Sequence, residues 1–111
     1  MPEIRFSDLS VSRRVFVRQC QRLGFGKITS LTVSEADPVF TQATDVFMDV
    51  KLDNDDSARP EQSLADFVLP AETVRFFAQL DTIGNGVVEH VEIRAGVPRR
   101  MLFKAASEKP R

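Results

Sequence analysis

The chain has 111 residues, of which 42% are hydrophobic and 28% charged. This length favours a single domain over residues 1–111, and the composition is too apolar for a disordered chain. The start of the chain lacks a basic segment followed by an apolar run, and no later run approaches the roughly 20 apolar residues that span a bilayer, so we expect neither export nor a membrane partner.

The net charge of −1 hides a separation of charges along the chain. Residues 1–30 carry six basic and two acidic side chains (+4), residues 31–93 three basic and thirteen acidic ones (−10), and residues 94–111 six basic and one acidic one (+5). This separation fits either an anionic partner or surfaces that complement each other within the fold. The one cysteine, Cys20, cannot form an internal disulfide, which favours a cytoplasmic protein.

A first helix is predicted from about Ser10 or Ser12 to Leu23. A serine hydroxyl can accept hydrogen bonds from the free amides of the first turn, and Gly24 suits the end of the helix. At helical spacing, apolar residues fall on one side and arginines on the other; these are Leu9, Phe16, Cys20 and Leu23 against Arg14, Arg18 and Arg22.

From Gly26 the pattern changes to a period of two, which predicts a half-buried strand. Strict alternation would point Thr29, Leu31 and Val33 to one side and Ile28, Ser30 and Thr32 to the other. Ala36-Asp37-Pro38 is expected to break this strand, and a second strand is predicted over Val46–Leu52. The acidic stretch 53–66, which contains Pro60, is expected to be a surface loop.

A second helix is predicted over about Ala71–Ile83, because Pro70 suits a first turn and Gly84-Asn85-Gly86 suits a C-terminal stop. A hairpin is expected to follow. It pairs Val87–Arg94 with Arg99–Ala105 across a short loop that contains Gly96.

The pattern repeats after sixty positions. Residues 15–40 align with 75–100 without a gap, and five of the twenty-six aligned pairs are identical. The repeat predicts an α+β fold, αββαββ by internal duplication, with pseudo-repeats at about 10–52 and 70–106. Two such units most simply form a four-stranded, mainly antiparallel sheet with both helices on one face. The alternative is that any two αββ stretches share such helix ends and turns.

Alternation along the strands selects candidates for a partner surface. It places four apolar residues on the sheet face away from the helices, among Ser30, Asp49, His90, Glu92 and Lys104; they are Ile28, Phe47, Val88 and Leu102. If contiguous, they would form a partner-binding surface or a homodimer interface, whereas scattered exposed apolar residues would carry no meaning.

The residues that could carry chemistry are few. One Cys and one His give no zinc-ligand spacing, and the stretch Asp53–Ser57 lacks the glycine of a calcium loop. Gly24 and Gly26 follow a helix, whereas phosphate-binding glycines precede one. We therefore expect no metal, no cofactor and no catalytic residues, which leans away from an enzyme.

Arginines supply the candidates for nucleic-acid binding. They lie in the first helix and the last hairpin, and are Arg14, Arg18, Arg22, Arg99 and Arg100, with Arg13 and Lys27 beside them. The alternative is a solvated helix face. The acidic middle of the chain and the absence of Tyr and Trp for base stacking argue against nucleic acid.

The segments 23–28, 38–40 and 86–98 resemble a group of small bacterial proteins of unassigned function. The resemblance implies a bacterial, cytosolic setting and no particular activity. The residues favour a non-enzymatic protein-interaction or accessory module that uses the outer sheet face, either alone or as a homodimer. The alternative is a weak nucleic-acid-binding protein that uses the arginines of the first helix.

Overall fold

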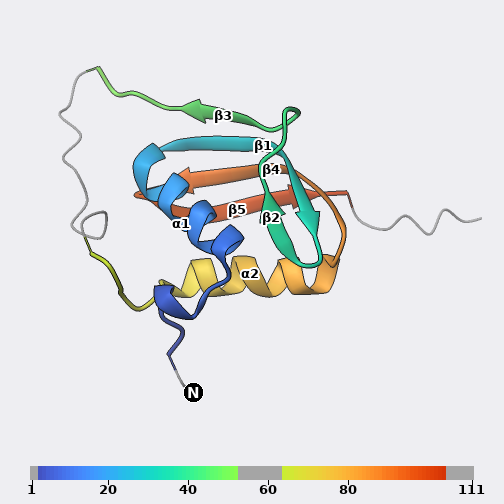
Figure 1. Ribbon diagram of the computed structural model, residues 1–111. Helices are drawn as coiled ribbons and strands as arrows, with labels where there is room; N and C mark the ends of the chain where they lie inside the picture. Colours follow the sequence, from blue (N-terminus) through green and yellow to red (C-terminus); the bar gives the residue numbers. More distant parts are fainter. Residues whose placement is uncertain (1–2, 53–63, 105–111) are drawn as a thin grey trace, which may run out of the picture.

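The computed structural model describes residues 3–52 and 64–104, which form two helices and an antiparallel sheet (Figure 1). This confirms the α+β class. Most of the surface loop predicted at 53–66, and the predicted end of the second hairpin at Ala105, lie outside the described residues. In chain order the elements are the short 3-10 helix η1 (Phe6–Asp8), α1 (Val11–Leu23), β1 (Gly26–Ser34), β2 (Asp37–Val39), β3 (Asp45–Met48), α2 (Ala71–Ile83), β4 (Gly86–Arg94) and β5 (Val97–Phe103).

Both helices begin and end where local signals place them. The Ser10 hydroxyl accepts a hydrogen bond from the Arg13 amide at 3.2 Å and caps α1. Gly24 and Gly84 follow the two helices with φ of 75° and 71°, values that glycine adopts without a steric penalty. The predicted limits of both helices are confirmed.

The sheet has the order β2-β1-β4-β5, and β3 pairs with β1 on the same edge as β2. Five strands therefore form within the described residues, and the predicted count of four is wrong. The expected break at Ala36-Asp37-Pro38 is a hairpin, because Glu35 and Ala36 both adopt positive φ and turn the chain back into β2. The predicted strand over Val46–Leu52 shortens to Asp45–Met48.

Both helices pack on one face of the sheet, and their apolar sides share one core (Figure 1). At its centre the Phe16 ring of α1 stacks on the Phe76 ring of α2, with 4.6 Å between ring centroids. The apolar side predicted for the first helix is buried, although Leu9 is only partly so. The fully buried strand residues beneath the helices include Ile28, Leu31, Val88 and Val91.

Ile28 and Val88 are buried, so their predicted place on the outer sheet face is wrong. Strict alternation fails in β1 because Ser30 adopts a φ of 54°, which turns the following residues over. In β4 the pairing with β5 shifts between Val88 and His90. These irregularities direct residues on both sides of them into the core.

Two helix–strand units repeat after sixty positions along the chain: α1, β1 and β2 form the first, and α2, β4 and β5 form the second. The bounds of α1 and α2, and those of β1 and β4, differ by sixty. In the β1–β4 ladder Gly26 pairs with Ile93, and the residues sixty positions away, Gly86 and Val33, pair as well. Each unit also bonds the other's hairpin turn, since the Ala36 amide donates to the Gly84 carbonyl at 2.7 Å and the Gly96 amide donates to the Gly24 carbonyl at 2.8 Å.

The N-terminal segment is tied to the residues that precede α2. The Phe6 amide donates to the Phe67 carbonyl at 2.8 Å, and the two rings stack with centroids 5.1 Å apart. Asp66 accepts hydrogen bonds from the Arg5 side chain at 2.8 Å and the Ser7 amide at 2.9 Å. The buried residues Phe67 and Leu69 thus close one side of the core.

Candidate protein-interaction surface

The side chains that could carry chemistry lie apart. Cys20 is in the core on the helix side of the sheet, and its burial raises the pKa of the thiol, which disfavours the nucleophilic thiolate. His90 faces the other side, beside Glu92 and Leu102. Within residues 3–52 and 64–104 no group of three or more His, Cys, Asp or Glu side chains could hold a metal ion. No helix in the same ranges has the length and apolar character needed to cross a membrane.

The outer sheet face, meaning the face away from the helices, is mostly polar. Lys27 pairs with Phe47 of β3 and with Glu92 of β4, and Glu92 in turn pairs with Arg100 of β5. The charges in this row alternate in sign. Phe47 and Leu102 are both exposed, but β1 and β4 separate them. The four candidates therefore do not form one apolar patch.

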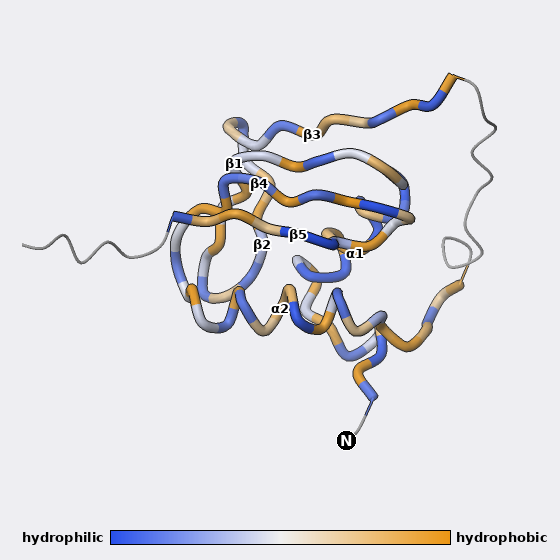
Figure 2. Tube along the Cα trace, turned by 180° about the vertical axis from the view of Figure 1, so that it is seen from behind, coloured by the Kyte–Doolittle hydropathy of each residue, from blue (hydrophilic) through white to orange (hydrophobic). Residues whose placement is uncertain are grey.

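Exposed apolar residues gather instead at one margin of the sheet. We define the β3 margin as residues 45–52, which are β3 and the four residues after it; Figure 2 shows β3 along one edge of the sheet and the chain after it leaving that edge. Of the thirteen exposed large apolar side chains among the described residues, five lie here; their exposed fractions are 39% for Val46, 47% for Phe47, 58% for Met48, 58% for Val50 and 95% for Leu52. A run of this kind marks an interaction surface or an aggregation risk.

The β3 margin also has an unpaired backbone edge. The Asp49 amide donates to the Phe25 carbonyl at 2.7 Å, so Asp49 directs its backbone groups towards β1. In an antiparallel ladder successive residues direct these groups to opposite sides. Val46 and Met48 therefore direct theirs away from β1, where no described element pairs with them (Figure 1). Val50, which follows β3, would do the same in a strand extended beyond Met48.

A glycine lets β3 lie against β1. A Cβ atom on Gly26 would come within 1.9 Å of the Phe47 carbonyl oxygen, so any side chain there would push β3 away. Two lysines cover aromatic rings beside this contact. The Lys27 ammonium lies 5.1 Å from the Phe47 ring centroid, and the Lys51 ammonium lies 5.7 Å from that of Phe25. The sequence pattern indicates only that Gly26 follows a helix and begins a strand.

The opposite margin of the sheet is protected. β5 contains Pro98, which has no amide to donate, and the charged residues Arg99 and Arg100. Proline and charge are the features by which natural proteins prevent edge strands from pairing. The β3 margin is therefore the edge better suited to a partner.

The arginines of α1 are not equivalent. Arg18 stacks on the Phe6 ring at 4.3 Å, donates to the Gln21 side chain at 2.9 Å and also donates to the Leu64 carbonyl. Arg14 and Arg22 line the same open groove of about 280 Å³. Arg18 lines this groove as well, and it also holds the N-terminal segment through its contacts with Phe6 and Leu64.

The arginines of β5 lie in a different groove, of about 210 Å³, between α2 and β5. Arg99 donates to Glu72 at 2.8 Å, and Arg75 and Arg100 line the same groove. The predicted nucleic-acid candidates thus divide into two separate groups.

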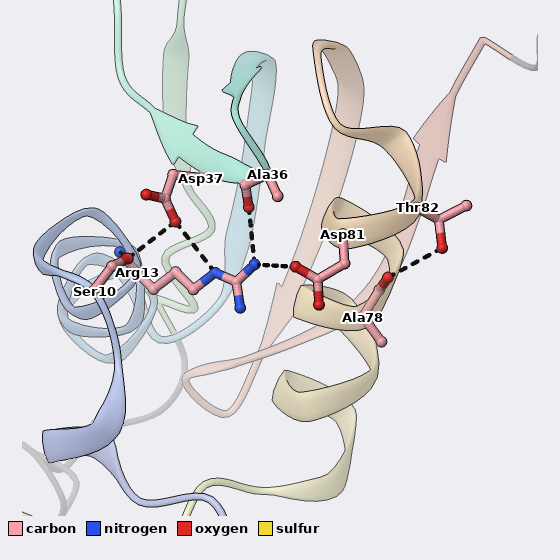
Figure 3. Close-up of polar contacts among 7 residues, drawn as sticks. All are labelled: Ser10, Arg13, Ala36, Asp37, Ala78, Asp81 and Thr82. Atoms are coloured by element: carbon pink, nitrogen blue, oxygen red, sulfur yellow. Dashed lines mark hydrogen bonds and ion pairs between the residues drawn. The ribbon is translucent and has the colours of Figure 1, made fainter.

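Arg13, which precedes Arg14 in α1, contacts residues of three elements, a role that the sequence did not predict (Figure 3). Its Nη2 donates to the Ala36 carbonyl at 2.9 Å and to Asp81 Oδ1 at 2.6 Å. Its Nε lies 3.4 Å from Asp37 Oδ1, an ion pair without hydrogen-bond geometry. The guanidinium also covers the Phe77 ring at 4.8 Å. Arg13 therefore links α1, the turn before β2 and α2.

Comparisons with protein-family models, with curated proteins and with solved structures found no match to this chain. In structural terms, residues 3–52 and 64–104 form an α+β fold with two α-helices on one sheet face and, at β3, an apolar edge with which no other described element pairs.

Proposed function

We propose that this protein is a non-enzymatic interaction module that binds a protein partner at the β3 margin. The observation that carries the proposal is the coincidence of an unpaired strand edge with five exposed apolar side chains in residues 45–52. An extended segment of a partner can add to such an edge as a further strand.

The physical basis is twofold. The backbone groups of Val46, Met48 and Val50 can form a ladder with the partner, which supplies alignment. Their side chains gain roughly 1.5–3 kcal/mol each when fully buried, which supplies affinity. Phe47 stays in the proposed surface, whereas Leu102 on β5 is separated from it by β1 and β4 and is outside it.

Site-specific photo-crosslinking in the native cells tests this proposal. A photoreactive amino acid in place of Val50, an exposed residue of the margin, should give a crosslinked protein adduct. The same amino acid in place of Ala78, which is exposed on α2, serves as the matched control and should give none. If Val50 and Ala78 give the same result, the margin is not a binding surface.

A second candidate function is weak nucleic-acid binding by α1. It is favoured by one observation, the shared groove lined by Arg14 and Arg22. Binding should then weaken steeply with salt, because each neutralised phosphate releases counterions. Replacing both residues, Arg14→Glu with Arg22→Glu, should abolish it. Arg18 is unsuitable for this test because it supports Phe6. Binding that ignores salt would contradict this candidate.

We also propose that the two helix–strand units arose by internal duplication. The equal spacing of the element bounds, the matching helix ends and the reciprocal turn bonds support it. A bacterial, cytoplasmic setting stays a prediction that rests on the lone cysteine and the sequence resemblance.

A further inference from the structure

We propose that the partner at the β3 margin is a second copy of this chain, which pairs antiparallel to the first with the two-fold axis at Val50. The inference rests on the proposed function and specifies its partner. The result would be one continuous sheet across two subunits.

The residues of the margin are complementary to themselves. In Met48-Asp49-Val50-Lys51-Leu52, an acidic and a basic residue flank a central valine, and an apolar residue stands at each end. When a second copy runs in the opposite direction about Val50, Asp49 faces the partner's Lys51, and Lys51 faces the partner's Asp49. Opposite charges that face each other across a ladder stabilise it, and like charges destabilise it.

The backbone directions agree with this register. Asp49 bonds to Phe25 of its own chain, so Met48 directs its amide and carbonyl outwards. β3 ends at Met48, and pairing with a second copy would extend it through residues 49–52, which would turn the backbone groups of Val50 outwards as well. Val50 would therefore exchange both hydrogen bonds with the partner's Val50. Asp49 would fall at a site without ladder bonds, where the Cα atoms of facing residues lie only about 4.5 Å apart. The two ion pairs between Asp49 and Lys51 would thus occupy the sites at which the facing Cα atoms of the two strands are closest.

The side chains also separate by face. In the extended strand, Met48, Val50 and Leu52 would alternate with Asp49 and Lys51, so the apolar side chains of both copies would meet on one face of the joined sheet and both ion pairs would lie on the other. These three residues are among the most exposed large apolar residues of the described chain. A register about Met48 would instead place Asp49 against the partner's Phe47.

Sedimentation over a concentration series tests the inference with the purified protein. The wild type should be in equilibrium between monomer and dimer. Asp49→Lys puts like charges opposite each other twice in the dimer and should weaken association about tenfold or more. Lys51→Asp should do the same. Both changes are on exposed side chains, and circular dichroism should show an intact fold.

Mixing the two variants gives the decisive result. Each is expected to be monomeric alone, but together they restore two opposite-charge pairs and should form a heterodimer. The double variant, Asp49→Lys with Lys51→Asp, should again form a homodimer. The control Glu89→Lys makes the same charge change at an exposed site outside the margin and should associate as the wild type does.

Three outcomes would overturn the inference. They are a wild type that stays monomeric at all concentrations, an Asp49→Lys dimer as tight as the wild type, and mixed variants that fail to associate. If the wild type is monomeric but position 50 crosslinks to a different protein, the second copy is excluded and the proposed function stands. If position 50 forms no adduct as well, both proposals fail.

Discussion

Arg13 is charged and largely covered, since only 18% of its side chain is exposed. Two aspartates, a carbonyl and an aromatic ring surround it. Its removal would leave the Ala36 carbonyl without that donor and would separate Asp37 from its cation. These losses should lower the free energy of unfolding by more than the loss of an exposed ion pair does, because the remaining polar groups are partly desolvated.

We expect Arg13→Met, which retains much of the side-chain volume, to lower the free energy of unfolding by about 1–3 kcal/mol. Arg22→Met on the exposed side of α1 is the matched control and should change it by less than about 0.5 kcal/mol. Urea denaturation of both variants measures the difference. Equal effects would show that Arg13 is not a structural link.

Asp66 should make stability depend on pH. The hydrogen bond from the Arg5 side chain, together with that from the Ser7 amide, lowers the pKa of Asp66 from its usual 3.8 to about 2. A lowered pKa in the folded state stabilises the fold above the unfolded-state value, and the contribution is lost as pH falls through the folded-state value.

The wild type should therefore be more stable than Asp66→Asn near neutral pH. That difference should shrink as pH falls from about 4 to about 2. Urea midpoints measured at several pH values provide the test. A difference that stays constant down to the lowest pH would contradict the role assigned to the Arg5–Asp66 pair.

At the scale of elements, the attachment of β3 depends on the missing side chain of Gly26. Gly86 stands sixty positions later at the start of β4, where an added Cβ would meet only the Ile83 side chain at 3.4 Å. The two glycines therefore have equivalent positions and different surroundings.

Gly26→Ala should detach β3 and remove the protection of the Asp49 amide from hydrogen exchange. Because a self-paired margin needs β3 in place, the same variant should also lose dimerisation. Gly86→Ala is the control, and its stability should stay within about 1 kcal/mol of the wild type. Retained protection of Asp49 in Gly26→Ala would show that β3 tolerates a shift.

At the scale of the whole molecule, the two helix–strand units depend on each other. The Phe16–Phe76 stack joins the two helices, and each hairpin turn bonds a carbonyl of the opposite unit. Neither unit completes its own core or its own turn, so the described domain should unfold as one cooperative unit.

A double-mutant cycle should detect this coupling. Phe16→Leu and Phe76→Leu should couple by about 0.5–1.5 kcal/mol, the range for stacked aromatic pairs. Phe67 stacks on Phe6 instead, so Phe67→Leu combined with Phe76→Leu is the control and should be additive within about 0.5 kcal/mol. Equal coupling in the two cycles would contradict a specific contact between the units.

The helices could be placed from the sequence because their signals are local. Ser10, Gly24 and Gly84 each act within a turn of the helix that they limit. The second hairpin could be recognised from Gly96, a residue that adopts positive φ readily. For the candidate site, alternation predicts the exposure of Phe47, but it carries no information about the open backbone edge beside it.

The remaining features depend on contacts between distant residues. The turn at Glu35-Ala36 contains no glycine or asparagine, and the Asn85 side chain and the Gly84 carbonyl of the other unit hold it in place. Ile28 and Val88 turn inwards because their strands are irregular where they pair and pack. Local sequence therefore determined where helices and turns lie, since those signals act within a few residues. Only the tertiary structure decided which strand faces are covered and which edge stays unpaired, because those features depend on partners far away in the chain.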